Sequence, residues 1–118
     1  MISTPLVAAS IKPFVLSILN DGESYGYAII QRVKSLTGGR MEWTTSTLYP
    51  VLHSLENKAF LRSEWRASPD GPRRKYYRLT RKGAKALVVE KRQWMDVHSA
   101  LMQLWDPAEG TSQILVHA

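Results

Sequence analysis

Residues 44–79 read TTSTLYPVLHSLENKAFLRSEWRASPDGPRRKYYRL, and the spacing of the apolar side chains changes within this stretch. In the first part they recur every three or four residues, as on one face of an α-helix: Leu48, Val51, Leu52 and Leu55. Over 61–66 charged residues occupy every second position, which is typical of a two-faced β-strand. SPDGP at 68–72 is a strong turn signal, and an aromatic and basic strand follows at 73–79. The stretch therefore predicts a helix followed by a β-hairpin.

Two more helices are predicted before this stretch. The first covers residues 11–19 and is ended by the NDG sequence that follows it. The second is N-capped by Ser24 and is stopped by the glycines at 38–39. TTS at 44–46 then offers three N-cap candidates for the third helix. Three short helices followed by a hairpin predict a winged helix-turn-helix domain over residues 1–80.

A long helix is predicted after the hairpin, from the N-cap Thr80 to Trp105. Gly83 is expected to weaken its first turn by roughly 1 kcal/mol relative to alanine. Residues spaced seven apart give this helix a broad apolar face, which a small three-helix core has little room to cover. We therefore expect residues 81–105 to form a dimerisation helix, and a two-fold dimer suits palindromic DNA. The contacts expected in the dimer are Leu87, Val88, Trp94, Leu101, Met102 and Trp105.

The predicted fold is mainly α-helical with a small β-hairpin. It combines a winged helix-turn-helix domain with a long C-terminal dimerisation helix. Residues 106–118 have no lasting periodicity and are expected to form a flexible tail. With 118 residues, the chain is long enough for one compact domain and short for two.

Composition excludes several classes of protein. The chain has no cysteine, which excludes disulfide scaffolds, thiolate metal sites and thiol catalysis. Its apolar runs are far shorter than the ~18 residues of a membrane span, and its first residues do not resemble a signal peptide. The three histidines lack metal-ligand spacing, and no phosphate-binding loop or nucleophile elbow is present. We expect a cytoplasmic protein with no enzymatic activity, no metal, no cofactor and no membrane association.

Basic charge is concentrated in one part of the chain. The formal net charge is +6 and the pI is about 9.8. Residues 58–92 contain twelve Lys or Arg and three acidic residues, so the remainder is slightly acidic. A local cationic surface of this kind is typical of a nucleic-acid-binding domain. The alternative is a solvated basic surface that has no partner.

Three motifs resemble those of PadR-type transcriptional regulators. SYGYAI at 24–29 resembles the start of that family's second helix, and STLYPVL at 46–52 resembles its recognition helix. RRKYYRLT at 73–80 is similar to its wing and to the junction with the next helix. Because the chain ends soon after one C-terminal helix, it resembles the shorter branch of the family. The resemblance implies a homodimeric winged-helix regulator that binds double-stranded DNA, and we expect a repressor.

Polar side chains near the start of the predicted recognition helix are candidates for contacts with bases. Such a helix needs short donors and acceptors near its N-terminus, where base edges in the major groove are within reach. The candidates on this helix are Thr45, Ser46, Thr47, Tyr49 and His53. The alternative for the first of them is that they only cap the helix. Tyr25 either contacts a phosphate or packs beside Tyr49 in the core.

Arg73, Arg74 and Lys75 are further candidates for DNA contact. Three consecutive cations in a hairpin repel one another, and we expect them to serve no structural purpose. They can straddle a phosphate backbone or enter a minor groove instead. The alternative is a solvated wing. Arg62 and Arg66 on the facing strand are candidates to extend the cationic patch.

The long helix also carries candidate ligand-binding residues, namely Trp94, Met95 and His98. The resemblance implies that short family members bind planar apolar compounds at the dimer interface, and an indole can stack on such a compound. The alternative is that Trp94 and Met95 are ordinary packing residues. The function expected is therefore a ligand-responsive repressor that binds a palindromic operator as a homodimer. Two alternatives are a protein–protein adaptor and a ligand-sensing dimer without specific DNA binding.

Overall fold

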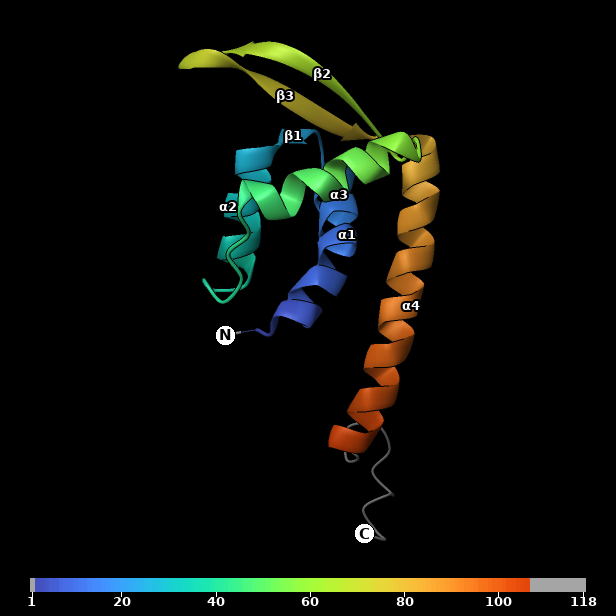
Figure 1. Cartoon of the computed structure of the whole chain (residues 1–118). Coiled ribbons are helices and arrows are strands. Elements are labelled where there is room, and N and C mark those ends of the chain that lie inside the picture. The colour runs from blue at the N-terminus through green and yellow to red at the C-terminus, as the bar shows by residue number, and fades with distance from the viewer. Residues whose placement is uncertain (1, 107–118) are drawn as a thin grey trace, which may run out of the picture. The chain divides into compact units, whose positions relative to one another are not determined.

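The computed structural model describes residues 2–106. The elements follow one another as α1 (Thr4–Asn20), β1 (Ser24–Tyr25), α2 (Gly26–Leu36), α3 (Thr45–Asn57), β2 (Leu61–Ser68), β3 (Gly71–Leu79) and α4 (Arg81–Trp105) (Figure 1). The predicted fold, mainly α-helical with a hairpin and a long last helix, is confirmed. Within the described residues, no helix combines the length and hydropathy needed to cross a membrane.

Helix α1 is longer than the sequence pattern indicated. It begins at Thr4 instead of residue 11, with Ser3 at the N-cap position. Pro5 lies in the first turn, where a missing N–H removes no intrahelical hydrogen bond. The periodic apolar face starts only at Ile11 because the turns before it are mostly exposed. The sequence pattern therefore predicted the part of α1 that packs against the core and missed the exposed part before it.

The predicted hairpin is two strands of a three-stranded antiparallel sheet with the order β1-β3-β2. The added strand, β1, pairs Ser24 with Tyr77 and Tyr25 with Tyr76. The prediction that Ser24 caps α2 is therefore wrong, because its backbone is extended and belongs to the sheet. Tyr25 occupies the N-cap position, and its side chain makes no capping hydrogen bond.

The predicted N-cap Thr80 is confirmed, and Thr44 is the one of the three candidates that caps α3. The Thr44 hydroxyl accepts a hydrogen bond from the Thr47 N–H at 3.3 Å, which caps α3. The Thr80 hydroxyl accepts from the Gly83 N–H at 2.9 Å and caps α4. The same Thr80 hydroxyl donates to the Ala59 carbonyl at 2.7 Å, so this cap also joins the helix to the turn before β2.

The hydrophobic core is formed by one face of each of the first three helices, the inner side of the sheet and the first turns of α4. Leu48, Leu52 and Leu55 anchor α3 in this core. Leu87 is 8% exposed and belongs to the same core, so its side chain is already buried within its own chain, and its predicted contact in a dimer stays a prediction.

The chain divides into two compact units after Leu87. The first unit therefore includes the start of α4 as well as the winged helix-turn-helix elements, and the second contains the rest of that helix. Division into compact units does not test where one domain ends and the next begins, so the domain boundary after residue 80 stays a prediction. The tail predicted over 106–118 lies outside the described residues, except for Asp106.

Candidate nucleic-acid interface

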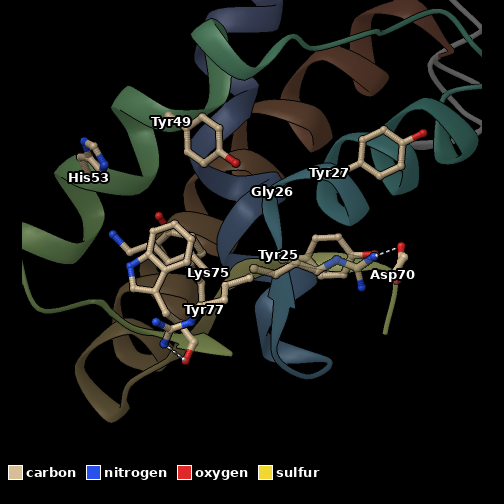
Figure 2. Close-up of a pocket in the computed structure, with 11 residues that line it drawn as sticks. Tyr25, Gly26, Tyr27, Tyr49, His53, Asp70, Lys75 and Tyr77 are labelled. Atoms are coloured by element: carbon tan, nitrogen blue, oxygen red, sulfur yellow. Dashed lines mark hydrogen bonds and ion pairs between the residues drawn. The ribbon is translucent and has the colours of Figure 1, made fainter. Parts of the chain in front are cut away.

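A groove of about 590 Å³ lies between the start of α2, the exposed face of α3 and the wing, by which we mean β2, β3 and the turn that joins them. Figure 2 shows side chains from these elements around it. It brings together six of the nine predicted DNA-binding residues, which are Tyr25, Tyr49, His53, Arg73, Arg74 and Lys75. The remaining three, Thr45, Ser46 and Thr47, lie in the first turn of α3 and do not line the groove.

Two tyrosine rings pack against each other across the strands, and an arginine guanidinium lies over each of them. The rings of Tyr25 and Tyr76 meet edge to face, with centroids 5.3 Å apart. The Arg74 guanidinium lies 4.4 Å from the Tyr25 ring centroid, and that of Arg66 lies 4.8 Å from the Tyr76 centroid. Tyr25 is thus half-buried in the sheet and is not part of the core, so the alternative of core packing beside Tyr49 is wrong. Stacking of this kind holds β1 against the wing.

Arg66 is neutralised inside the protein. Its guanidinium forms ion pairs with Glu23, which precedes β1, and with Glu64 on its own strand. Hydrogen bonds from Arg66 lower the pKa of both carboxyls below their ordinary value of 4.5. Arg66 therefore ties the wing to the segment before β1 and adds little net charge to the cationic patch.

The three consecutive cations of β3 differ in their surroundings. Arg74 forms an ion pair with Asp70 at 2.8 Å. Lys75 lies 3.9 Å from a carboxylate oxygen of Glu56 on α3. Arg73 is exposed and forms no ion pair within residues 2–106; its guanidinium donates only a long hydrogen bond, 3.3 Å, to a backbone carbonyl. The expectation that all three lack structural partners is therefore wrong for Arg74 and Lys75.

Glu56 joins the recognition helix to the wing. Besides its contact with Lys75 on β3, it accepts a hydrogen bond of 2.6 Å from the Ser63 hydroxyl on β2. One carboxylate thus contacts both strands of the hairpin. The contacts fix the orientation of the wing relative to α3, which a rigid two-part DNA surface requires.

Only some of the hydroxyl groups around the first turn of α3 take part in the capping hydrogen bonds. The Thr44 hydroxyl lies 3.1 Å from that of Thr47 and 3.3 Å from that of Ser46. The Thr45 hydroxyl is exposed and has no hydrogen-bond partner in the described part of the chain. Tyr49 and His53 are also exposed and follow on the side that faces the groove. The Thr44 hydroxyl thus caps the helix, whereas contact of the other hydroxyl groups with bases stays a prediction.

Sequence reasoning missed several residues that line the groove. Tyr27 is 63% exposed and Trp65 is 56% exposed, although both are aromatic. Tyr27 lies within the SYGYAI motif and Trp65 within the predicted first strand of the hairpin, but the exposure of both side chains depends on which face the fold buries. Asp70 also lines the groove and comes from the predicted turn. Tyr77 also lines the groove; it is 1% exposed, and its hydroxyl has no hydrogen-bond partner within residues 2–106. Burial, and then the Glu56 charge, raises the pKa of Tyr77 to about 12.

The predicted ligand and dimer residues of α4 beyond Leu87 lie in the second unit. Trp94, Met95 and His98 are exposed, and the Trp94 indole N–H donates to Glu90 at 3.1 Å. Val88 and Trp105 are exposed, whereas Leu101 and Met102 are half-buried. Two exposed apolar residues that we did not predict, Val97 and Leu104, widen the apolar face. Among the described residues, no three side chains gather as metal ligands.

Comparison with known proteins agrees with this geometry. Residues 15–89 match the profile of the Transcriptional regulator PadR-like family. A transcriptional regulator from Clostridium thermocellum is similar in structure, with a TM-score of 0.78 and 26% identity, over 87% of this chain and 97% of that one. A PadR family transcription regulator from Clostridium difficile has a TM-score of 0.69 and 31% identity, over 81% and 98% of the two chains. An uncharacterised protein from Lysinibacillus sphaericus is 28% identical over 82% of this chain and 89% of its own length.

Proposed function

This chain belongs to the PadR-like family of transcriptional regulators, and on that premise we propose that it is a ligand-responsive repressor that acts as a homodimer. DNA-binding regulation follows from the family, whose members are transcription regulators and not enzymes. The observation that carries the proposal is the groove, where three wing cations face hydroxyl-bearing aromatic residues of α2 and α3. We also propose a cytoplasmic location, because the ligand is chromosomal DNA.

We propose that α3 enters the major groove of an operator while the wing follows the adjacent backbone towards the minor groove. The exposed side chains of Thr45, Tyr49 and His53 support the first contact. The exposed guanidinium of Arg73 and the cations beside it support the second. A phosphate backbone then occupies the groove between the two elements, so phosphate contacts set the register and α3 reads the bases.

Fluorescence anisotropy with DNA from upstream of the protein's own gene tests this proposal. Arg73→Ala should weaken binding to operator and scrambled DNA alike, and should reduce the salt slope of log K by about 0.9, because one phosphate contact is lost. Lys85→Ala removes the same charge from an exposed site outside the groove and serves as the matched control. Weak binding that is indifferent to both sequence and salt would contradict the proposal.

Base reading by α3 has a different signature from phosphate binding. Ser46→Ala and Thr47→Ala should lower affinity for the operator more than affinity for scrambled DNA, which relaxes discrimination between sites. Thr45→Ala should do the same, since its hydroxyl has no hydrogen bond within the described residues. Equal losses on both kinds of DNA would assign these residues to the backbone instead.

We propose that the second part of α4 forms the homodimer contact through Val88, Trp94, Leu101, Met102 and Trp105. The exposure of Val88 and Trp105, together with the exposed neighbours Val97 and Leu104, supports this assignment. Apolar surface of this extent on one helix is normally covered by a partner. A second copy of the chain is the partner that also matches a palindromic operator.

We propose that a planar apolar effector binds beside Trp94, Met95 and His98 and weakens operator binding. An exposed indole and a flexible thioether support an adaptable aromatic site. Quenching of tryptophan fluorescence by such a compound, with Trp94→Phe as the control, measures this binding. A compound that binds free and operator-bound protein with equal affinity would contradict effector control, because it cannot shift the equilibrium.

A further inference from the structure

Asp70 is the one carboxylate among the residues that line the groove. It lies in the turn between β2 and β3, where the Ser68 hydroxyl donates to the Pro72 carbonyl at 2.6 Å. Gly71 completes this turn with a φ of +123°, which other residues rarely adopt. The Asp70 side chain is 69% exposed, so it faces any polyanion that enters the groove. A negative charge at this place opposes the binding of DNA.

Arg74 is the partner of this carboxylate. An oxygen of Asp70 lies 2.8 Å from the Arg74 guanidinium, which also lies 4.4 Å from the centre of the Tyr25 ring. A hydrogen bond with the Tyr76 side chain, and then the charge of Asp70, raise the pKa of Arg74 above its ordinary value. Carboxylates and phosphates present similar pairs of oxygen atoms to a guanidinium group. Asp70 therefore binds Arg74 through the same kind of contact that a guanidinium group makes with a phosphate. The neighbouring Arg73 has no comparable partner within residues 2–106.

We propose that Asp70 is an internal substitute for a DNA phosphate, which neutralises Arg74 in the free protein and limits sequence-independent binding. The inference rests on the proposed DNA-binding function. Non-specific affinity comes from phosphate neutralisation and counterion release, and a cation with its own carboxylate contributes little net charge to either. Because a genome offers a large excess of competing sites, a lower non-specific affinity increases the fraction of protein on its operator.

The opposite charges of Asp70 and Arg74 lead to different predictions for the removal of each residue. Removal of Asp70 leaves Arg74 free for phosphate, whereas removal of Arg74 leaves an unpaired negative charge in the groove. Removal of both deletes a neutral pair. The two single variants should therefore change DNA affinity in opposite directions, and the double variant should lie between them, near the original protein.

The experiment measures anisotropy of a scrambled duplex as a function of salt with the full-length chain. Asp70→Asn should bind about two- to fivefold tighter, the range of a surface ion pair, with a log K salt slope steeper by about 0.9. Asp70→Ser, which also suits a turn, should show the same gain. Arg74→Gln should bind more weakly, and the double variant with Asp70→Asn should bind as the original protein does.

Asp21→Asn is the matched control, because Asp21 also pairs with an arginine, Arg32 at 2.6 Å, but does not line the groove. It should change neither affinity nor slope. Unchanged or weaker binding by both Asp70 variants would overturn the inference. Unchanged binding would show that Asp70 has no effect on DNA affinity, and weaker binding would show that it positions Arg74 for contact with DNA. An equal gain from Asp21→Asn would also overturn it and indicate a general effect of net charge.

The salt titration of the original protein distinguishes a failure of this inference from a failure of the proposed DNA-binding function. Salt-dependent binding by the original protein together with no gain from the Asp70 variants would overturn the role of Asp70 alone. No salt-dependent binding of any duplex by the original protein would overturn both.

Discussion

At the scale of single residues, Gly83 shows packing and helix propensity acting in opposite directions. As an isolated helix residue it is less favourable than alanine. In the fold it lies against the backbone of Phe60, where an added Cβ would overlap the carbonyl oxygen and would approach Leu79 Cδ1 to 2.7 Å. The absence of a side chain therefore lets α4 begin close to the start of β2.

Gly83→Ala should accordingly destabilise the protein by about 1–3 kcal/mol, the usual cost of overpacking, despite the higher helix propensity of alanine. Urea unfolding followed by circular dichroism measures this difference. A gain in stability of roughly 1 kcal/mol would show instead that helix propensity decides at this position.

Tyr77 carries a buried hydroxyl group that has no hydrogen-bond partner in the described part of the chain. Because an unsatisfied buried polar group is costly, Tyr77→Phe should stabilise the protein by about 1 kcal/mol. Burial also raises the pKa of Tyr77 from 10.0 to about 12, so the fold favours the neutral phenol. That contribution to stability is complete below pH 10.0 and is lost as the pH rises towards 12.

Urea unfolding at neutral pH and again above pH 10.0 tests both expectations for Tyr77. The phenylalanine variant should start more stable and should lose less stability in alkali than the original protein. A lower stability at neutral pH would show that the hydroxyl has a partner that compensates for its burial.

At the scale of elements, the wing is held in place by ion pairs at several points. Arg66 connects β2 to Glu23 before β1, and Glu56 connects α3 to both wing strands. Since hydrogen bonds from Arg66 lower the pKa of Glu23 and Glu64, the charged carboxylates are favoured in the fold. Their contribution to stability is therefore present above pH 4.5 and is lost as the pH falls below that value.

Glu23→Gln should reduce this acid sensitivity, because the amide has no proton to gain in this range. The melting temperature should fall less between pH 5.5 and pH 3.5 in the variant than in the original protein, although Glu64 still contributes. Asp21→Asn is again the control, since that carboxylate lies outside the wing. Identical pH profiles for Glu23→Gln and the original protein would show that the contact does not contribute to stability.

At the scale of the whole molecule, the proposed regulator depends on a second copy of the chain. Val88→Glu combined with Leu101→Glu places two charges on the proposed contact face of α4 and should convert a dimer into monomers in sedimentation equilibrium. Monomers should bind a palindromic operator far more weakly, because each then holds only one half-site.

Gln103→Glu makes a similar charge change at an exposed polar position of the same helix and should leave the assembly intact. An original protein that sediments as a monomer would contradict the dimer. Dimers that persist in the double variant would move the contact to another surface.

The four helices, the hairpin, the cap at Thr80 and the cationic wing could be predicted from the sequence, because periodicity, turn residues and charge are local properties. For the cap of α3 the sequence offered three candidates, of which the structure selects Thr44. The three-dimensional fold was needed to assign Ser24 to a strand and Leu87 to the core. It also decided which wing cations are paired, since Asp70, Glu23 and Glu56 reach them through folding of the hairpin and its packing on α3. Strand pairing, burial and the ion pairs of Glu23 and Glu56 join residues distant in sequence, so their partners are set by the fold and not by local spacing. Asp70 and Arg74 are only four residues apart, but the hairpin turn has to form before they meet.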